Sequence, residues 1–235
     1  MLDWLGSALG LREALIAVVV LGVVIFTLAK PLLRFSRVID TLNTWVGRIA
    51  AWFIALSVLV SAGNALVRYS FNSSSNAWLE IQWIFFSATF LLCAAWTLLS
   101  NEHIRIDIVN SLFPKSIRNG IDLFGHLFFL LPLCVVMSKL GWPFLISSFR
   151  QQEVSTNAGG LIVWPSKLLV PLAFGFLLLQ AISEIIKRSA IMRGYLSDTA
   201  SGGGHHASAE AEAARLQEAL AEEAEARAKG QGHSL

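Results

Sequence analysis

Long apolar stretches alternate with short polar segments along most of the chain. Five such stretches run from Leu11 to Ala29, Trp45 to Val67, Trp78 to Leu99, Ile121 to Leu140 and Leu161 to Ile186. Each has about the 20 predominantly apolar residues that a helix needs to cross a bilayer. They are continuous runs, whereas the strands of a membrane barrel would alternate over about ten residues. The pattern predicts an all-α, polytopic membrane helix bundle, and the first stretch also suits a helix that lies in the interface.

Composition supports a membrane protein without catalytic chemistry. Apolar residues make up 55% and charged residues 14% of the 235 residues, whereas soluble domains have about a quarter charged residues. A net charge of +2 does not suggest a nucleic-acid partner. The chain lacks GxxxxGK[ST], GxGxxG, HExxH and GxSxG motifs. Cys93 and Cys134 lie at different depths, roughly 15 Å apart along antiparallel helices, too far for a disulfide. We therefore expect no enzyme activity, cofactor or bound metal.

Lysine and arginine are distributed unequally between the two sets of connections. One side carries ten: Lys30, Arg34, Arg37, Arg48, Arg105, Lys115, Arg118, Lys187, Arg188 and Arg193. The other side carries five: Arg12, Arg68, Lys139, Arg150 and Lys167. The richer side is expected to be cytoplasmic. This places the N-terminus outside and the C-terminus inside.

Ionisable groups within a membrane span are costly, so each one is a candidate for function or partner contact. Glu80 begins the third stretch and Arg68 ends the second, and we expect the two to pair at the outer rim. There are two alternatives: Glu80 contacts an external partner protein, or it binds substrate. Asp122 and His126 are one helical turn apart in the fourth stretch. Hydrogen bonding between helices is the expected role of this pair, and a proton path is the alternative.

Other polar positions are isolated in the sequence. Asn64 lies in the second stretch, and Lys167, Gln180 and Glu184 lie in the fifth. Lys167 is expected to extend toward the outer surface on its four-carbon stem. Trp78 and Trp164 are expected at the outer rim, where tryptophan is enriched.

Two segments are expected to lie along the membrane surface. After the third stretch, His103 and Asp107 share a helical face, and Arg105 is placed to meet lipid phosphates. Pro114 ends this amphipathic connector. Between the fourth and fifth stretches, the WPFLISSF segment (residues 142–149) has aromatic anchors at both ends.

Several short motifs, in order along the chain, resemble one protein family. They are NALVRYSF at 64–71, WLE at 78–80, HIRID at 103–107 and GGLIVWPSK at 159–167. Their order and their positions at helix ends resemble the small membrane subunit of tripartite ATP-independent periplasmic (TRAP) transporters, the DctQ type. The resemblance covers roughly residues 40–188. That family has four helices, so the first apolar stretch is an addition to its pattern.

The resemblance implies a role and partners. Residues 1–39 would be an extra transmembrane segment with a basic cytoplasmic loop, 40–190 the four-helix membrane domain, and 191–235 a flexible linker with an Ala/Glu-rich cytoplasmic tail. A large membrane subunit would carry the substrate by an elevator motion, usually driven by sodium. A periplasmic binding protein would deliver a carboxylate or related organic solute. This chain would be a scaffold that contacts the large subunit, the binding protein and membrane lipids.

Two other functions are compatible with a small helical membrane protein. An independent channel or exporter would need a polar stripe through at least two helices. A membrane anchor of a redox complex would need paired histidines at suitable depths to hold haem. His126 is the one histidine well inside a predicted span, so the scaffold function is favoured.

Overall fold

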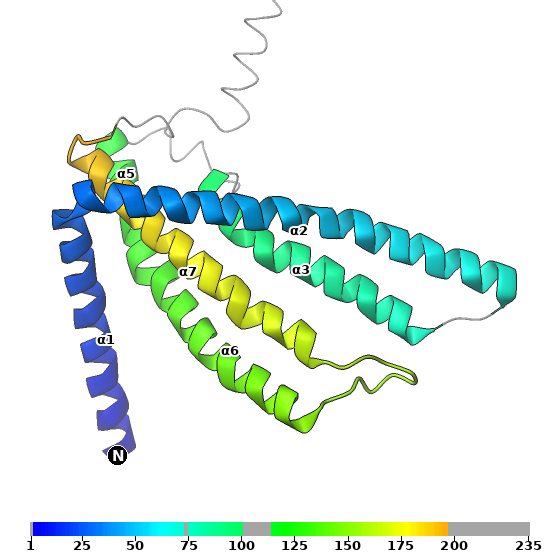
Figure 1. The fold of residues 1–235 in the computed structure, drawn as a ribbon. Helices are drawn as coiled ribbons and strands as arrows, with labels where there is room; N and C mark the ends of the chain where they lie inside the picture. Colours follow the sequence, from blue (N-terminus) through cyan, green and yellow to red (C-terminus); the bar gives the residue numbers. More distant parts are fainter. Residues whose placement is uncertain (1, 73–74, 101–113, 197–235) are drawn as a thin grey trace, which may run out of the picture. The chain divides into compact units, whose positions relative to one another are not determined.

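The computed structural model describes residues 2–72, 75–100 and 114–196, and within them it is helical apart from one antiparallel bridge between Val154 and Ile162 (Figure 1). The elements are α1 (Leu2–Thr27), α2 (Ala29–Phe71), α3 (Asn76–Ser100), α5 (Lys115–Gly125), the π-helix η1 (His126–Leu130), α6 (Leu131–Gln151) and α7 (Trp164–Met192). The predicted HIRID connector lies outside the described residues.

Four of the described helices are long and apolar enough to cross a membrane. They are α2, α3, α7 and the continuous helical segment Ile117–Gln151, which joins most of α5 to η1 and α6. The predicted all-α membrane bundle is confirmed. In α1 the described apolar part is the shorter stretch Ile16–Thr27, so a fifth crossing stays a prediction.

Two helices are longer than hydropathy predicted. α2 has 43 residues, or roughly 65 Å of helix, against a hydrocarbon core of roughly 30 Å. It begins at Ala29, so Lys30, Arg34 and Arg37 lie on a helix and the predicted loop there is wrong. α6 continues through Pro143 to Gln151. The expected interfacial segment 142–149 is therefore the end of a spanning helix.

Helices α2 and α3 pack closely, because small residues face large ones across the contact. A Cβ atom on Gly47 would lie 2.6 Å from the Cβ of Trp96, so only glycine fits there. Hydroxyl groups reinforce the contact. Thr89 donates to the carbonyl of Ala50 at 3.1 Å, and Ser57 donates to the carbonyl of Gln82 at 3.2 Å.

Helix α7 is the centre of the bundle. It packs against α2 and α3 on one side and α6 on the other (Figure 1), and it also contacts α1, α5 and η1. Its second half is almost wholly buried, including Gln180, Glu184 and Arg188. An apolar cluster of Ile25, Leu131, Ile185 and Ile186 joins α1, α6 and α7 beside these polar residues.

Candidate functional site

Glu80 binds the connection between α6 and α7. Its Oε1 accepts hydrogen bonds from the Ser155 hydroxyl and from the Asn157 amide at 2.8 Å. Its Oε2 accepts the backbone N–H of Leu161 at 2.6 Å. Both carboxylate oxygens therefore have partners within the chain. We call Glu80, Ser155, Asn157 and Leu161 the Glu80 site.

The connection between α6 and α7 folds into a short hairpin that brings residues 155–161 to the Glu80 carboxylate. Val154 and Ile162 form the bridge, supported by hydrogen bonds from Ser155 N–H to Leu161 O and from Val163 N–H to Glu153 O, each 2.9 Å. The turn between them uses Gly159 at a φ of 72°, a left-handed conformation that favours glycine. A Cβ on Gly160 would lie 2.8 Å from Glu80 Oε1. The backbone therefore approaches the carboxylate more closely here than a residue with a side chain would allow.

Glu80 does not pair with Arg68, and that prediction is wrong. Arg68 lies exposed in the last turn of α2, with its guanidinium 5.8 Å from the ring centre of Tyr69. The sequence gave no sign that residues 155–161 fold back over Glu80. One backbone N–H, one hydroxyl and one side-chain amide in that connection satisfy the carboxylate without a cation.

Lys167 also has a partner near this end of the bundle. Its ammonium group forms an ion pair with Glu153 and lies 4.2 Å from the ring centre of Phe144. The hydrogen bond from Lys167 lowers the pKa of the Glu153 carboxyl below its ordinary value. Trp164, the first residue of α7, packs edge-on against Phe149 with 5.5 Å between ring centres. Lys167 thus ties α7 to the end of α6 instead of extending into water.

A second polar cluster joins α2 to the other end of α7. We call it the Asp40 network, and it consists of Asp40, Asn43, Gln180, Ser183, Glu184 and Lys187. Gln180 is fully buried at its centre. It accepts from Asn43 at 2.7 Å and donates to Asp40 at 3.0 Å and to Glu184 at 3.1 Å.

Ion pairs complete this end of the bundle. Lys187 lies 3.2 Å from a carboxylate oxygen of Asp40 and also pairs with Glu184. Arg188, which is buried, lies 3.3 Å from Asp122 and donates to Asn119 at 2.9 Å. These contacts connect α2 and α5 to α7.

The Asp40 network corrects the expectation that Gln180 and Glu184 are isolated. Asp40 and Asn43 did not stand out in the sequence, because both precede the apolar stretch at 45–67. One signal was present in the sequence. Ser36, Asp40, Asn43 and Gly47 recur at helical spacing and mark a polar face on the first half of α2.

The remaining predicted residues are not brought together. Asn64 is half-buried in α2, and its Oδ1 atom has no hydrogen-bond partner. Trp78 lies in the first turn of α3 and is exposed. His126 begins the π-helix, where its carbonyl accepts from the N–H of Leu131. His103, Arg105 and Asp107 lie outside the described residues.

An apolar barrier separates the two polar sites. On α7 the twelve residues from Leu168 to Leu179 read LLVPLAFGFLLL and contain no polar side chain, a length of roughly 18 Å. In the described part of the chain, no three His, Cys, Asp or Glu residues are grouped so that they would hold a metal ion. This arrangement binds helices to one another and offers no polar route along α7.

Comparison with protein families gives one match. The family described as "Tripartite ATP-independent periplasmic transporters, DctQ component" matches residues 57–190, more than half of the chain. The chain belongs to the DctQ family. It is therefore a non-catalytic, multi-pass membrane component of a TRAP transporter. No curated protein and no solved structure matched the chain.

The family match covers the Glu80 site but only the α7 residues of the Asp40 network. Gln180, Glu184 and Lys187 lie within the matched range, whereas Asp40 and Asn43 precede it. The first half of α2, which this DctQ component uses to close the network, therefore lies outside the matched segment.

Proposed function

We propose that this DctQ component is a fixed frame for the large membrane subunit of its transporter, which moves a carboxylate or related organic solute. The frame takes no part in substrate binding. A periplasmic binding protein delivers the solute, and an elevator-type movement of the large subunit carries it across.

The observation that carries this proposal is the division of α7 into two polar ends and an apolar centre. At one end the Glu80 site and Lys167 connect α3, α6 and α7. At the other, Asp40 and Arg188 connect α2 and α5 to α7. Polar groups that bind neighbouring helices resist relative movement of those helices. A channel would instead need polar groups that continue through the centre.

We also propose an orientation for the frame. Lys30, Arg34 and Arg37 lie in the first turns of α2, and Lys187 and Arg188 lie at the end of α7 that is bound to Ser36 and Asp40 of α2. Arg193 donates to the carbonyls of Phe26 and Thr27, both at 2.9 Å, at this same end. Because positive charge favours the cytoplasmic side, the Asp40 network faces the cytoplasm and the Glu80 site faces the periplasm.

Co-expression with the large subunit tests this function. After purification through a tag on this chain and reconstitution in liposomes, the two-subunit complex is expected to take up solute when the binding protein and a sodium gradient are supplied. This chain alone is expected to transport nothing. Transport by the isolated chain, or full transport by the large subunit without it, would contradict the frame.

A further inference from the structure

Lys139 is a cation within the membrane-spanning segment Ile117–Gln151. Lys139 lies on the exposed side of α6, and the described hydrogen bonds and ion pairs do not include it. Its neighbours Val135, Val136 and Leu140 are exposed and apolar. The ionisable groups of the two polar sites are paired, whereas Lys139 and the exposed Arg48 on α2 have no hydrogen bond or ion pair in the described part of the chain.

The depth of Lys139 follows from the packing of α6 against α7. Gly141 meets Pro171, where an added Cβ would lie 3.1 Å from the proline Cβ, and Phe144 lies beside Lys167. Because the helices run antiparallel, Lys139 is level with Ala173. That level is about six residues, roughly 9 Å, from Lys167 and falls within the apolar stretch 168–179. Lys139 therefore presents its charge at the depth of the hydrocarbon core.

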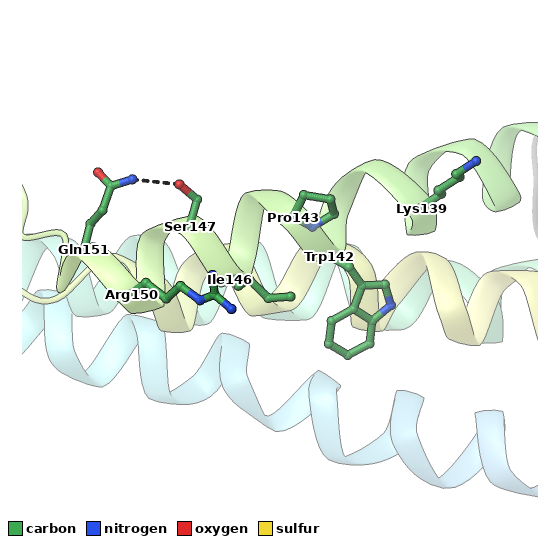
Figure 2. Close-up of a pocket in the computed structure, with 7 residues that line it drawn as sticks. All are labelled: Lys139, Trp142, Pro143, Ile146, Ser147, Arg150 and Gln151. Atoms are coloured by element: carbon green, nitrogen blue, oxygen red, sulfur yellow. Dashed lines mark hydrogen bonds between the residues drawn. The ribbon is translucent and has the colours of Figure 1, made fainter.

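Lys139 belongs to a continuous surface groove. The groove has a volume of about 700 Å³ and is lined by Lys139, Trp142, Pro143, Ile146, Ser147, Arg150 and Gln151. Figure 2 shows Lys139 at one end of it and Gln151 at the other, where Gln151 donates to Ser147 at 2.8 Å. The helical spacing of these residues places them opposite Cys134, Gly141 and Ser148, which are buried against the bundle.

We propose that this face of α6, the α6 groove, is where a helix of the large membrane subunit docks, with an acidic side chain placed against Lys139. The proposal rests on the frame function. Charge complementarity favours a protein partner, since a lone ammonium group in hydrocarbon is costly and a carboxylate from a second helix neutralises it.

A phospholipid headgroup is a less suitable partner for the ammonium group of Lys139 than a carboxylate on a second helix. Lipid phosphates lie at the membrane surface, near the level of Arg150. Arg150 is eleven residues from Lys139, roughly 16 Å along the helix, which is beyond the reach of a lysine side chain. Lipid tails carry no anion at the depth of Lys139. The groove therefore fits a partner helix that carries its own carboxylate.

Photocrosslinking in the co-expressed complex tests the docking face. A photoreactive amino acid replaces Ile146 in the groove or, as a matched control, Ile49 on α2, which is also exposed and apolar. The Ile146 position is expected to give a covalent product with the large subunit, and the Ile49 position is not. Capture of the large subunit from Ile49 but not from Ile146 would overturn the docking face and leave the frame function intact. If the two subunits do not purify together at all, the frame function itself fails.

Two substitutions then test the role of the charge. Lys139→Met keeps the length of the side chain but removes the ammonium group, and Lys139→Arg keeps a cation. We expect Lys139→Met to lower the yield of co-purified large subunit by roughly fivefold or more, with Lys139→Arg close to the unaltered chain. Equal yields from both variants would show that Lys139 meets only lipid or water and would overturn the acidic partner.

Discussion

At the scale of single residues, Glu80 holds the connection between α6 and α7 through three hydrogen bonds. Glu80→Gln keeps the shape of the side chain but removes its charge and one acceptor, so the bonds from Ser155 and Leu161 weaken. We expect faster hydrogen exchange at the Leu161 amide, measured by mass spectrometry of the membrane-reconstituted chain. Asn157→Ala removes one bond of the three and should have the smaller effect. Unchanged protection of residues 153–163 in Glu80→Gln would contradict this role.

The Glu153–Lys167 pair predicts a dependence of stability on pH. The hydrogen bond from Lys167 lowers the pKa of Glu153 below its ordinary value of 4.5. A carboxyl with a lowered pKa in the folded state stabilises the protein above the pKa of the unfolded chain and loses that contribution as the pH falls through the folded-state value. Thermal unfolding measured at decreasing pH below 4.5 should therefore show a loss of stability. The Glu153→Gln variant should lose less, and an identical pH profile would remove this pair as the cause.

Gln180 is the centre of the Asp40 network, and its loss removes three hydrogen bonds from the buried contact between α2 and α7. Gln180→Leu is expected to lower the free energy of unfolding by about 1–3 kcal/mol, because Asp40, Asn43 and Glu184 each lose one hydrogen bond. Gln151→Leu is the control, since the exposed Gln151 bonds only to Ser147 on its own helix. Unfolding in mixed detergent micelles measures both. Equal effects would show that Gln180 has no special role.

The sequence revealed which residues were unusual but not which residues they would meet. Glu80 and Gln180 stand out because polar groups are rare in membrane spans. Their partners are 75 to 81 and 137 to 140 positions away along the chain. Local spacing cannot specify such contacts, since they depend on how the helices pack. Arg68 was a reasonable partner for Glu80 because each lies near the end of its apolar stretch. In the structure, Ser155, Asn157 and Leu161 bind Glu80 instead.

At the scale of elements, the contact between α2 and α3 depends on a glycine. Gly47→Ala places a methyl group 2.6 Å from the Trp96 Cβ, and this atom cannot move without shifting its helix. We expect a loss of about 1–3 kcal/mol in the free energy of unfolding. Gly63→Ala, on the same helix with no atom within 4 Å of the added methyl group, should leave stability unchanged or slightly increased. A small effect at both positions would mean that α2 and α3 are not tightly packed.

Hydropathy located the spanning helices but not their ends. The apolar stretches coincide with α3 and with most of α7, where the polar residues are few. In α2 the helix begins sixteen residues before the apolar stretch at Trp45. This first part stays helical because its polar face, including Ser36 and Asn43, is buried against α7. Hydropathy cannot detect a helix stabilised by polar packing.

At the scale of the whole molecule, α7 unites the described helices into one frame. Its polar ends are bound to α2, α3, α5 and α6, and its apolar centre contains no route for a solute. The α6 groove carries the unpaired charge of Lys139 within the apolar depth of the bundle, and we propose it as the contact with the large subunit. In the proposed function, this frame remains unchanged while the large subunit moves.

Distance measurement within the assembled transporter tests this claim most directly. Spin labels at Phe90 on α3 and Val136 on α6, both exposed, are introduced after replacement of Cys93 and Cys134 by alanine. Pulsed electron paramagnetic resonance then compares complexes held in their inward-facing and outward-facing states. The frame function predicts the same distribution of distances in both states. A distribution that shifts with the state of the large subunit would show that this chain moves during transport and would contradict the account.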